Sequence, residues 1–245
     1  MQKAWQLGVV EKWPKLKGAQ KATGSKAPGL TERGASCQAM ETRFGEPLLP
    51  FSDPDGMRLM LTGVAGAESE PAWSNGDIPM DYAIRGFHGA TLVLDSAEKT
   101  GAILTDVLGF REVGREGALT RFAASGEAKG CLIDIEEKKG VTRGHQGRGS
   151  VHHMAFRAAD DAEQALMAGK LKSAHEMYPT EQKDRNYFRS IYFREPGGVL
   201  FEVATEIPGF TVDESVEMLG RNLKLPSLLE ARRREIESVL PVLKD

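Results

Sequence analysis

Residues 189–206 read RSIYFREPGGVLFEVATE, in which two apolar segments flank the turn sequence Glu-Pro-Gly-Gly. Short apolar runs on either side of a Pro and Gly cluster predict two strands joined by a tight turn. Residues 43–63, RFGEPLLPFSDPDGMRLMLTG, have the same form, and residues 51–61 align without a gap with residues 193–203. A hairpin that occurs twice indicates an internal repeat.

The sequence also contains two copies of the strand that begins this repeat. Residues 84–94, IRGFHGATLVL, align with residues 149–158, GSVHHMAFRA, and the alignment places His88 over His153. The rest of each unit is expected as a helix and further strands, at 96–108, 111–114, 119–123 and 130–136 in one unit and at 160–171, 189–194 and 199–204 in the other. Because each unit runs β-α-β-β-β, the predicted fold class is α+β.

These patterns divide the chain into five expected parts. They are a poorly ordered N-terminal extension (1–40), the remnant of an earlier βαβββ module (41–63), a linker (64–83), two complete modules (84–206) and a C-terminal capping segment with a helix (207–245). The extension holds seven Lys or Arg against two Glu, but it has no sustained hydrophobic period. We therefore expect an unstructured segment there rather than a basic arm for nucleic acid.

Composition excludes several classes of protein. Apolar residues make up 40% of the chain and charged residues 27%, which is typical of a soluble globular protein and not of a disordered one. A net charge of −3 provides no basic field for nucleic acid, and the absence of a run of about 18 apolar residues predicts no membrane span. Two cysteines, Cys37 and Cys131, are too few for a disulfide framework. The sequence thus predicts a protein of the reducing cytoplasm.

Glu202 is the most informative polar residue, because it lies inside the apolar segment VLFEVA. A buried carboxylate needs a cation, a proton or water beside it. Alternate side chains of a strand share a face, so His153 and Arg157 are expected on one face of the 151–157 strand and His152 on the other. Two imidazoles and one carboxylate from separate strands form the triad that binds Fe(II) or Mn(II). His88, His153 and Glu202 are therefore the candidate metal ligands.

Each candidate also has a structural interpretation. His88 alone is compatible with a hydrogen-bonded histidine at a strand end, and Glu202 with a solvent-facing edge strand. Met60 takes the place of Glu202 in the earlier unit, so the fold does not require a carboxylate there. Asp134 holds that place in the middle unit, where it is either a further ligand or, as we favour, an aspartate on an edge strand.

Three segments of the chain resemble a known family. They are GFHGATLVL, GSVHHMAFRAADDAEQ and, most specifically, the run 184–213, which reads DRNYFRSIYFREPGGVLFEVATEIPGFTVD. They resemble the vicinal-oxygen-chelate superfamily of glyoxalases, bleomycin resistance proteins and extradiol dioxygenases. Within it, residues 41–245 are similar to glyoxalase-like ring-cleaving dioxygenases of the hydroquinone type. The resemblance implies paired βαβββ modules that form a cup around a divalent metal, usually Fe(II), with Mn(II) as the other candidate.

The resemblance also implies roles for single residues. His153 and Glu202 match metal ligands of the family, and Arg185 and Tyr192 match polar residues that approach the substrate. Tyr192 or His152 is then the expected acid or base, and Arg185 is expected to stabilise anionic charge. The implied reaction is ring cleavage of an aromatic diol, a hydroquinone or a catechol, with O2.

One feature departs from the family pattern. Members of the hydroquinone type begin with a complete module whose first strand provides a histidine ligand, whereas residues 1–40 contain no histidine. Either His88 completes the metal site, or the third ligand belonged to a lost first module.

Three other functions are kept as alternatives. They are a glyoxalase-type isomerase, a thiol transferase on the same fold, and an inactive protein that sequesters an aromatic ligand. The expected partners are a small aromatic molecule and O2, without nucleic acid or membrane. Unpaired strand edges at 41–63 further predict a homo-oligomer.

Overall fold

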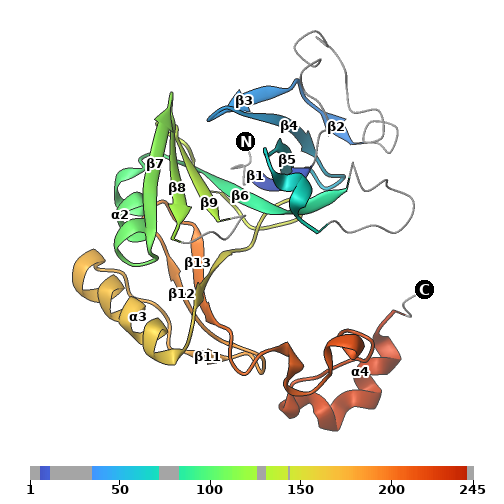
Figure 1. Cartoon of the computed structure of the whole chain (residues 1–245). Helices are drawn as coiled ribbons and strands as arrows, with labels where there is room; N and C mark the ends of the chain where they lie inside the picture. The colour runs from blue at the N-terminus through green and yellow to red at the C-terminus, as the bar shows by residue number, and fades with distance from the viewer. Residues whose placement is uncertain (1–5, 12–34, 72–82, 126–130, 143, 242–245) are drawn as a thin grey trace.

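The computed structural model describes residues 6–11, 35–71, 83–125, 131–142 and 144–241, and it contains two β-sheets (Figure 1). One sheet has nine strands in the order β2-β4-β5-β1-β6-β9-β8-β7, with β3 paired to β4. The other has four strands in the order β10-β13-β12-β11. Helices α2 and α3 accompany the sheets, so the fold class is mixed α+β, as the sequence predicts.

The two complete units have the same topology. The first consists of β6 (Ile84–Leu94), α2 (Glu98–Asp106), β7 (Phe110–Glu116), β8 (Leu119–Ala124) and β9 (Leu132–Glu137). The second consists of β10 (Met154–Ala158), α3 (Asp161–His175), β11 (Lys183–Asp184), β12 (Arg189–Arg194) and β13 (Leu200–Thr205). In each unit the first strand lies parallel to the last, β6 beside β9 and β10 beside β13. The internal repeat read from the sequence is thus a repeat of structure.

Helix α3 of the second unit begins where its cap residue predicts. The Asp160 carboxylate accepts a hydrogen bond from the Glu163 backbone N–H at 2.8 Å, which satisfies one of the free donors of the first turn. The helix continues beyond residue 171 and ends at Glu176, whose φ of 51° lies in the left-handed region.

An earlier unit completes the nine-stranded sheet. It contains β2 (Ser36–Cys37), β3 (Glu41–Arg43), β4 (Glu46–Ser52) and β5 (Arg58–Gly63). Strand β1 (Gln6–Glu11) lies parallel to β5 and antiparallel to β6, which is the place of a first strand in the repeat. These six residues are therefore an inner strand and not part of an extension. Residues 12–34, the rest of the expected basic segment, lie outside the described residues.

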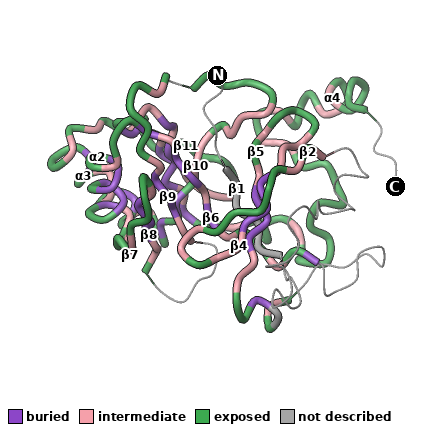
Figure 2. The backbone as a smooth tube through the Cα atoms, turned by 90° about the horizontal axis from the view of Figure 1, so that it is seen from above, coloured by how far each residue is buried: buried purple, intermediate pink, exposed green. Residues whose placement is uncertain are grey.

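A single hydrophobic core joins the two complete units. Leu92 and Leu94 of β6 and Phe201 and Val203 of β13 belong to it, and none of the four is more than 1% exposed. Helix α2 contributes Ile103 and Leu104, and α3 contributes Leu171. In Figure 2 many of the residues coloured as buried lie where these strands and helices meet. The shared core occupies one face of each sheet, so the opposite faces are free to carry polar groups.

The chain continues after β13 into a segment of short helices that extends away from the sheets in Figure 1. These helices are η4 (Phe210–Val212), η5 (Val216–Met218), η6 (Ser227–Arg232) and α4 (Arg233–Val239). Another short helix, η2 (Ala67–Ser69), lies elsewhere in the chain, directly after β5. Within the described part of the chain, no helix is long and apolar enough to cross a membrane.

Candidate metal and substrate site

Glu202 lies on the face of β13 opposite Phe201 and Val203, and only 3% of the residue is exposed. Three side chains offset the cost of burying its carboxylate. The Nε2 atom of His153 lies 2.7 Å from Oε2, and the Tyr192 hydroxyl donates a hydrogen bond to Oε1 at 2.8 Å. The Ser190 hydroxyl donates to the same Oε1. The carboxylate is therefore held through both oxygens.

Strand register explains why these groups meet. Tyr192 of β12 and Ala155 of β10 both lie directly opposite Glu202, one on each side of β13. Directly opposite residues project from the same face of a sheet, as do residues two apart on one strand. Ser190 precedes Tyr192 by two residues on β12, whereas His153 reaches the same carboxylate from just before β10 begins at Met154. Ser190 was not a sequence candidate, although the period of two along β12 would have identified it.

His152 and His153 do not follow the alternation expected of a strand. Their Nδ1 atoms lie 2.8 Å apart, and their rings meet edge to face with 5.1 Å between centroids. Strand β10 begins at Met154, so both histidines precede it and the period of two does not apply. His152 is exposed, while 34% of the His153 side chain is accessible. The site thus opens to solvent at the two imidazoles.

Arg185 reaches the same cluster from the turn between β11 and β12. Its Nη2 donates a hydrogen bond to the Tyr192 hydroxyl at 3.3 Å, and its guanidinium carbon lies 5.5 Å from the centre of the Tyr192 ring. The backbone N–H of Arg185 donates to the carbonyl of Phe188 at 2.9 Å, which closes the turn. The structure therefore brings together five sequence candidates: His152, His153, Arg185, Tyr192 and Glu202.

The sixth candidate, His88, lies in the other sheet. Its Nε2 is 3.1 Å from Oε2 of Glu46, not beside Glu202. The pairing of the strands shows why the sequence alignment misplaced His88. Thr91 of β6 lies opposite Asp134 of β9, and in the second unit Ala155 of β10 lies opposite Glu202 of β13, so Thr91 and Ala155 are equivalent. Counting back two residues from each, the counterpart of His153 is Gly89. The expected triad of His88, His153 and Glu202 is consequently not assembled in this structure.

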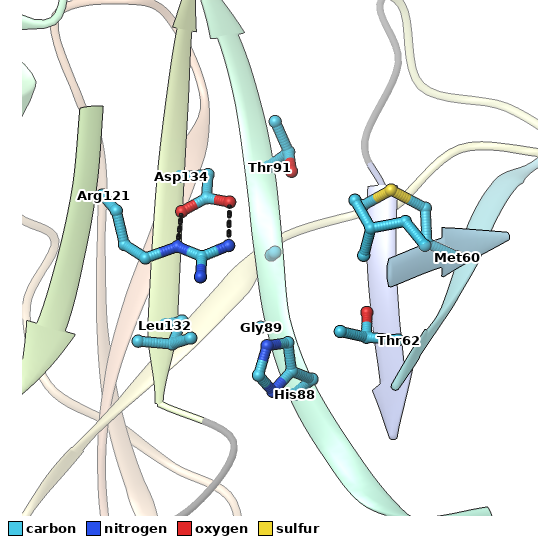
Figure 3. Close-up of a pocket in the computed structure, with 10 residues that line it drawn as sticks. Met60, Thr62, His88, Gly89, Thr91, Arg121, Leu132 and Asp134 are labelled. Atoms are coloured by element: carbon cyan, nitrogen blue, oxygen red, sulfur yellow. Dashed lines mark hydrogen bonds and ion pairs between the residues drawn. The ribbon is translucent and has the colours of Figure 1, made fainter. Parts of the chain in front are cut away.

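His88 lies near a network of ion pairs, of which Figure 3 shows the pair between Arg121 and Asp134. The Nε and Nη2 atoms of Arg121 bind the two carboxylate oxygens of Asp134 at 2.7 and 2.9 Å, and Nη1 binds Glu46 at 2.6 Å. The guanidinium carbon also lies 4.1 Å from the centre of the Phe44 ring. Asp134 lies on β9, between β6 and β8, so it is not on an edge strand. Both of its carboxylate oxygens are bound to Arg121, so neither is available to a metal ion.

The ion pairs of this network shift the pKa values of Glu46 and Arg121 toward their charged forms. Burial alone would raise the pKa of Glu46, but the hydrogen bonds and charges of His88 and Arg121 outweigh burial and lower that pKa below 4.5. Burial opposes the charge of Arg121, yet its bonds to Asp134 and Glu46 raise its pKa. The pocket beside these residues has a volume of only about 20 Å³, which is room for roughly one water molecule. An aromatic ligand does not fit there.

The Glu202 cluster contains two side chains of the types that bind metal ions. An imidazole nitrogen and a carboxylate oxygen, His153 Nε2 and Glu202 Oε2, converge within 2.7 Å, and they are donors of the types found in sites with two histidines and one carboxylate. Within the described residues, no group of three or more His, Cys, Asp or Glu side chains is placed to hold a metal ion. The donors therefore fit two positions of such a site.

Much of the chain is similar in sequence to known proteins. Residues 86–203 match the sequence model of the "Glyoxalase/Bleomycin resistance protein/Dioxygenase superfamily". The "Putative ring-cleaving dioxygenase MhqO" of Bacillus subtilis is 41% identical over 198 residues, which are 81% of this chain and 62% of that protein. The "Chlorohydroquinone/hydroquinone 1,2-dioxygenase" of Sphingobium indicum is 34% identical over 212 residues, which are 84% of this chain and 65% of that protein. The chain thus spans less than two thirds of the length of these two relatives.

A solved structure is similar over nearly the whole chain. The crystal structure of a Bacillus subtilis protein named as a "putative dioxygenase" superposes with a TM-score of 0.83 at 36% sequence identity. The superposition covers 99% of this chain and 74% of the other. The arrangement of the two sheets described above is therefore shared with that protein.

Proposed function

Since the chain belongs to the Glyoxalase/Bleomycin resistance protein/Dioxygenase superfamily, we propose that it acts as a metal-dependent ring-cleaving dioxygenase on an aromatic diol of the hydroquinone or catechol type. The observation that carries this proposal is the cluster around Glu202, where a metal-binding pair adjoins a phenol, a guanidinium and an exposed imidazole. O2 is the proposed second substrate, and Fe(II), or else Mn(II), is the proposed metal.

His153 and Glu202 are the residues that would hold the metal. A bound divalent ion supplies Lewis acidity toward a phenol oxygen, which lowers the pKa of that phenol. Glu202 is suited to this role because Ser190 and Tyr192 fix its Oε1, while Oε2 faces His153. Such outer hydrogen bonds orient a ligand and are part of a working metal site.

Three further side chains are placed to act on the substrate. The Tyr192 hydroxyl donates a hydrogen bond to Glu202 and accepts one from Arg185, so it can hold or pass a proton at Oη. The Arg185 guanidinium can pair with a phenolate oxygen and stabilise its charge. His152 is exposed beside His153, so its imidazole can exchange a proton with solvent at the mouth of the site.

One observation favours a second candidate function. Only two metal donors converge in the described part of the chain. A protein with this half-site can bind an aromatic ligand beside Tyr192 and Arg185 without turning it over. Sequestration of a diol is therefore the alternative to ring cleavage.

Metal content and oxygen consumption distinguish ring cleavage from sequestration. After anaerobic reconstitution with Fe(II), we expect one metal ion per chain by mass spectrometry and O2 uptake that depends on a hydroquinone or catechol. Glu202→Gln should lose both properties. Glu206→Gln is the matched control, because Glu206 is exposed and pairs with Arg157 on the surface, and it should retain both. Metal retained in Glu202→Gln would remove Glu202 from the site, and diol binding without O2 uptake in the unaltered protein would favour sequestration.

A further inference from the structure

A groove with a volume of about 360 Å³ lies beside helix α2 in the first complete unit. It runs between α2 and the strands β7 and β8, which are next to that helix in Figure 1, and it reaches the end of β9. The Glu202 cluster belongs to the other sheet and does not contribute to it. The volume is in the range of sites that hold small organic ligands.

Small residues on α2 leave room for this groove. Gly101 and Ala102 line it, while Ile103 and Leu104 of the same helix are buried in the core. At Gly101 the helix touches β8, because a Cβ atom there would lie 2.8 Å from Cζ of the Phe122 ring. Phe122 is 3% exposed and also lines the groove. One part of the groove is therefore apolar and contains an aromatic ring.

A buried hydroxyl group faces the same space. Thr120 and Phe122 are two residues apart on β8, so their side chains lie on one face of the strand, and both line the groove. Thr120 is only 5% exposed. In the described part of the chain, its hydroxyl has no hydrogen-bond partner. Because a polar group without a partner is costly to remove from water, this hydroxyl favours a polar group of a ligand in the groove.

The charged residues of the groove leave an excess of negative charge. Arg115 binds both carboxylate oxygens of Glu112, at 2.7 and 3.0 Å, so this pair has no net charge. Glu137 accepts a hydrogen bond from the backbone N–H of Ala97 at 2.9 Å. Among the described residues, neither Glu137 nor Glu98 is in an ion pair. The positive end of the dipole of α2 offsets part of their charge, but no side-chain cation does.

We propose that this groove is a binding site for a small organic ammonium ion with an apolar body. The ammonium group lies between Glu98 and Glu137 and donates a hydrogen bond to the Thr120 hydroxyl, which a group with three N–H donors can do. The apolar body contacts Phe122. An anion is disfavoured, because the guanidinium that lines the groove is already bound to a carboxylate. The site is separate from the Glu202 cluster and does not depend on the proposed dioxygenase function.

Three compounds with the same phenyl ring test the charge of the ligand. Isothermal titration calorimetry of the whole chain should detect 2-phenylethylammonium bound at one site per chain. The neutral 2-phenylethanol and the anionic 3-phenylpropionate should bind at least about tenfold more weakly, because each lacks the charged hydrogen bond to a carboxylate. None of the three compounds is a phenol, so none is a substrate for ring cleavage of a diol.

Glu137→Gln tests the carboxylate. The amide oxygen of glutamine can still accept the hydrogen bond from Ala97, so the start of α2 is preserved while the charge is lost. Binding of 2-phenylethylammonium should weaken about tenfold. Glu136→Gln is the matched control, because Glu136 is the preceding residue on β9 and its side chain projects from the opposite face. Its affinity should equal that of the unaltered protein.

Thr120→Val separates a ligand-binding role from a structural one. Valine has nearly the same shape without the hydroxyl, so the folded protein should be as stable as before or more stable, because a buried group without a partner is removed. Affinity for 2-phenylethylammonium should nevertheless fall about fivefold. Urea denaturation and calorimetry measure the two properties on the same samples.

Ala102→Leu tests the location of the site. Ala102 is an exposed residue of α2, so a leucine is compatible with the helix but occupies the groove, and binding should be lost. Ala165→Leu makes the same change at an exposed position of α3 in the second unit and should bind normally. Circular dichroism verifies that all variants are folded.

Each outcome decides the proposal. Preference for the ammonium compound, together with loss of binding in Ala102→Leu, supports it. Absence of binding at millimolar 2-phenylethylammonium, equal binding of the three compounds, or normal binding in Ala102→Leu overturns it. These measurements need neither metal nor O2, so failure of this site is distinguishable from failure of the proposed function.

Discussion

The carboxylates of Asp134 and Glu202 hold the same position in two copies of one repeat, yet their surroundings differ in chemistry. Asp134 is bound through both oxygens by Arg121, which also holds Glu46. Glu202 is bound by an imidazole and two hydroxyls. Arginine does not lose its proton in proteins and has no lone pair for a metal, whereas a histidine has both capacities. The same scaffold therefore carries a closed ion-pair network in one sheet and a chemically versatile site in the other.

Removing the arginine should have the largest effect on stability. Arg121→Ala leaves the buried carboxylate of Asp134 without its partner, which costs about 3–5 kcal/mol for buried pairs. Urea denaturation followed by circular dichroism measures the change. Arg115→Ala is the control, because its ion pair with Glu112 is exposed on β7 and its loss should change stability little. Equal losses in the two variants would show that the Arg121 network is not buried as described.

The histidines of the two sheets should differ in their effect on metal binding. His153→Ala removes a proposed ligand and should weaken Fe(II) binding at least about 100-fold, or about 2.8 kcal/mol. His88→Ala should leave metal affinity unchanged, because His88 contacts Glu46 in the other sheet. Titration with Fe(II) under anaerobic conditions measures both. A loss in His88→Ala as large as that in His153→Ala would restore His88 as a ligand.

Tyr192 allows a smaller test of the Glu202 cluster. Tyr192→Phe removes one hydrogen bond to the buried carboxylate, which should cost about 1 kcal/mol in stability while Ser190 and His153 remain. If Tyr192 transfers a proton, ring cleavage should fall by about 100-fold or more while metal content is retained. Tyr187→Phe is the control, because its hydroxyl bonds to Asp213 on the surface. An active Tyr192→Phe protein would assign the proton transfer to another group.

The smallest expected effect concerns pH and Glu46. The pKa of Glu46 is lowered in the folded protein, so its ionised form adds stability that is complete above about pH 4.5 and is lost as pH falls through the folded pKa. Glu46→Gln removes this contribution and should flatten the acid side of a plot of melting temperature against pH. Glu98→Gln, at an exposed position in the first turn of α2, should leave the slope as it is.

The local parts of the fold follow from sequence patterns. Both βαβββ units, the cap at Asp160 and the hairpin of β12 and β13 could be predicted, because each depends on residues close together in the chain. The grouping of Tyr192 with Glu202 also follows from the hairpin, since its register is set by the turn between them. A period of two on adjacent strands is information that a sequence carries by itself.

Other features depend on contacts between distant segments. Arg121 and Glu46 are 75 residues apart, and no local pattern indicates that this arginine would neutralise Asp134 and Glu46 together. Strand β1 forms from Gln6–Glu11, which have little apolar periodicity, because the edges of β5 and β6 provide partners on both sides. Pairing with distant strands can outweigh the weak propensity of so short a segment.

The position of His88 was likewise decided by tertiary structure. A shift in register between β1 and β6 falls at this residue, so alternation along the strand no longer predicts its face. The core that contains Leu92 and Phe201 then lies between the two polar faces. The repeat and most of the Glu202 cluster could be predicted from the sequence alone, because the period of a strand and the register of a hairpin depend on residues close together in the chain. Which histidine could join that cluster depended on how the two sheets pack, because burial of their apolar faces against each other turns their polar faces apart.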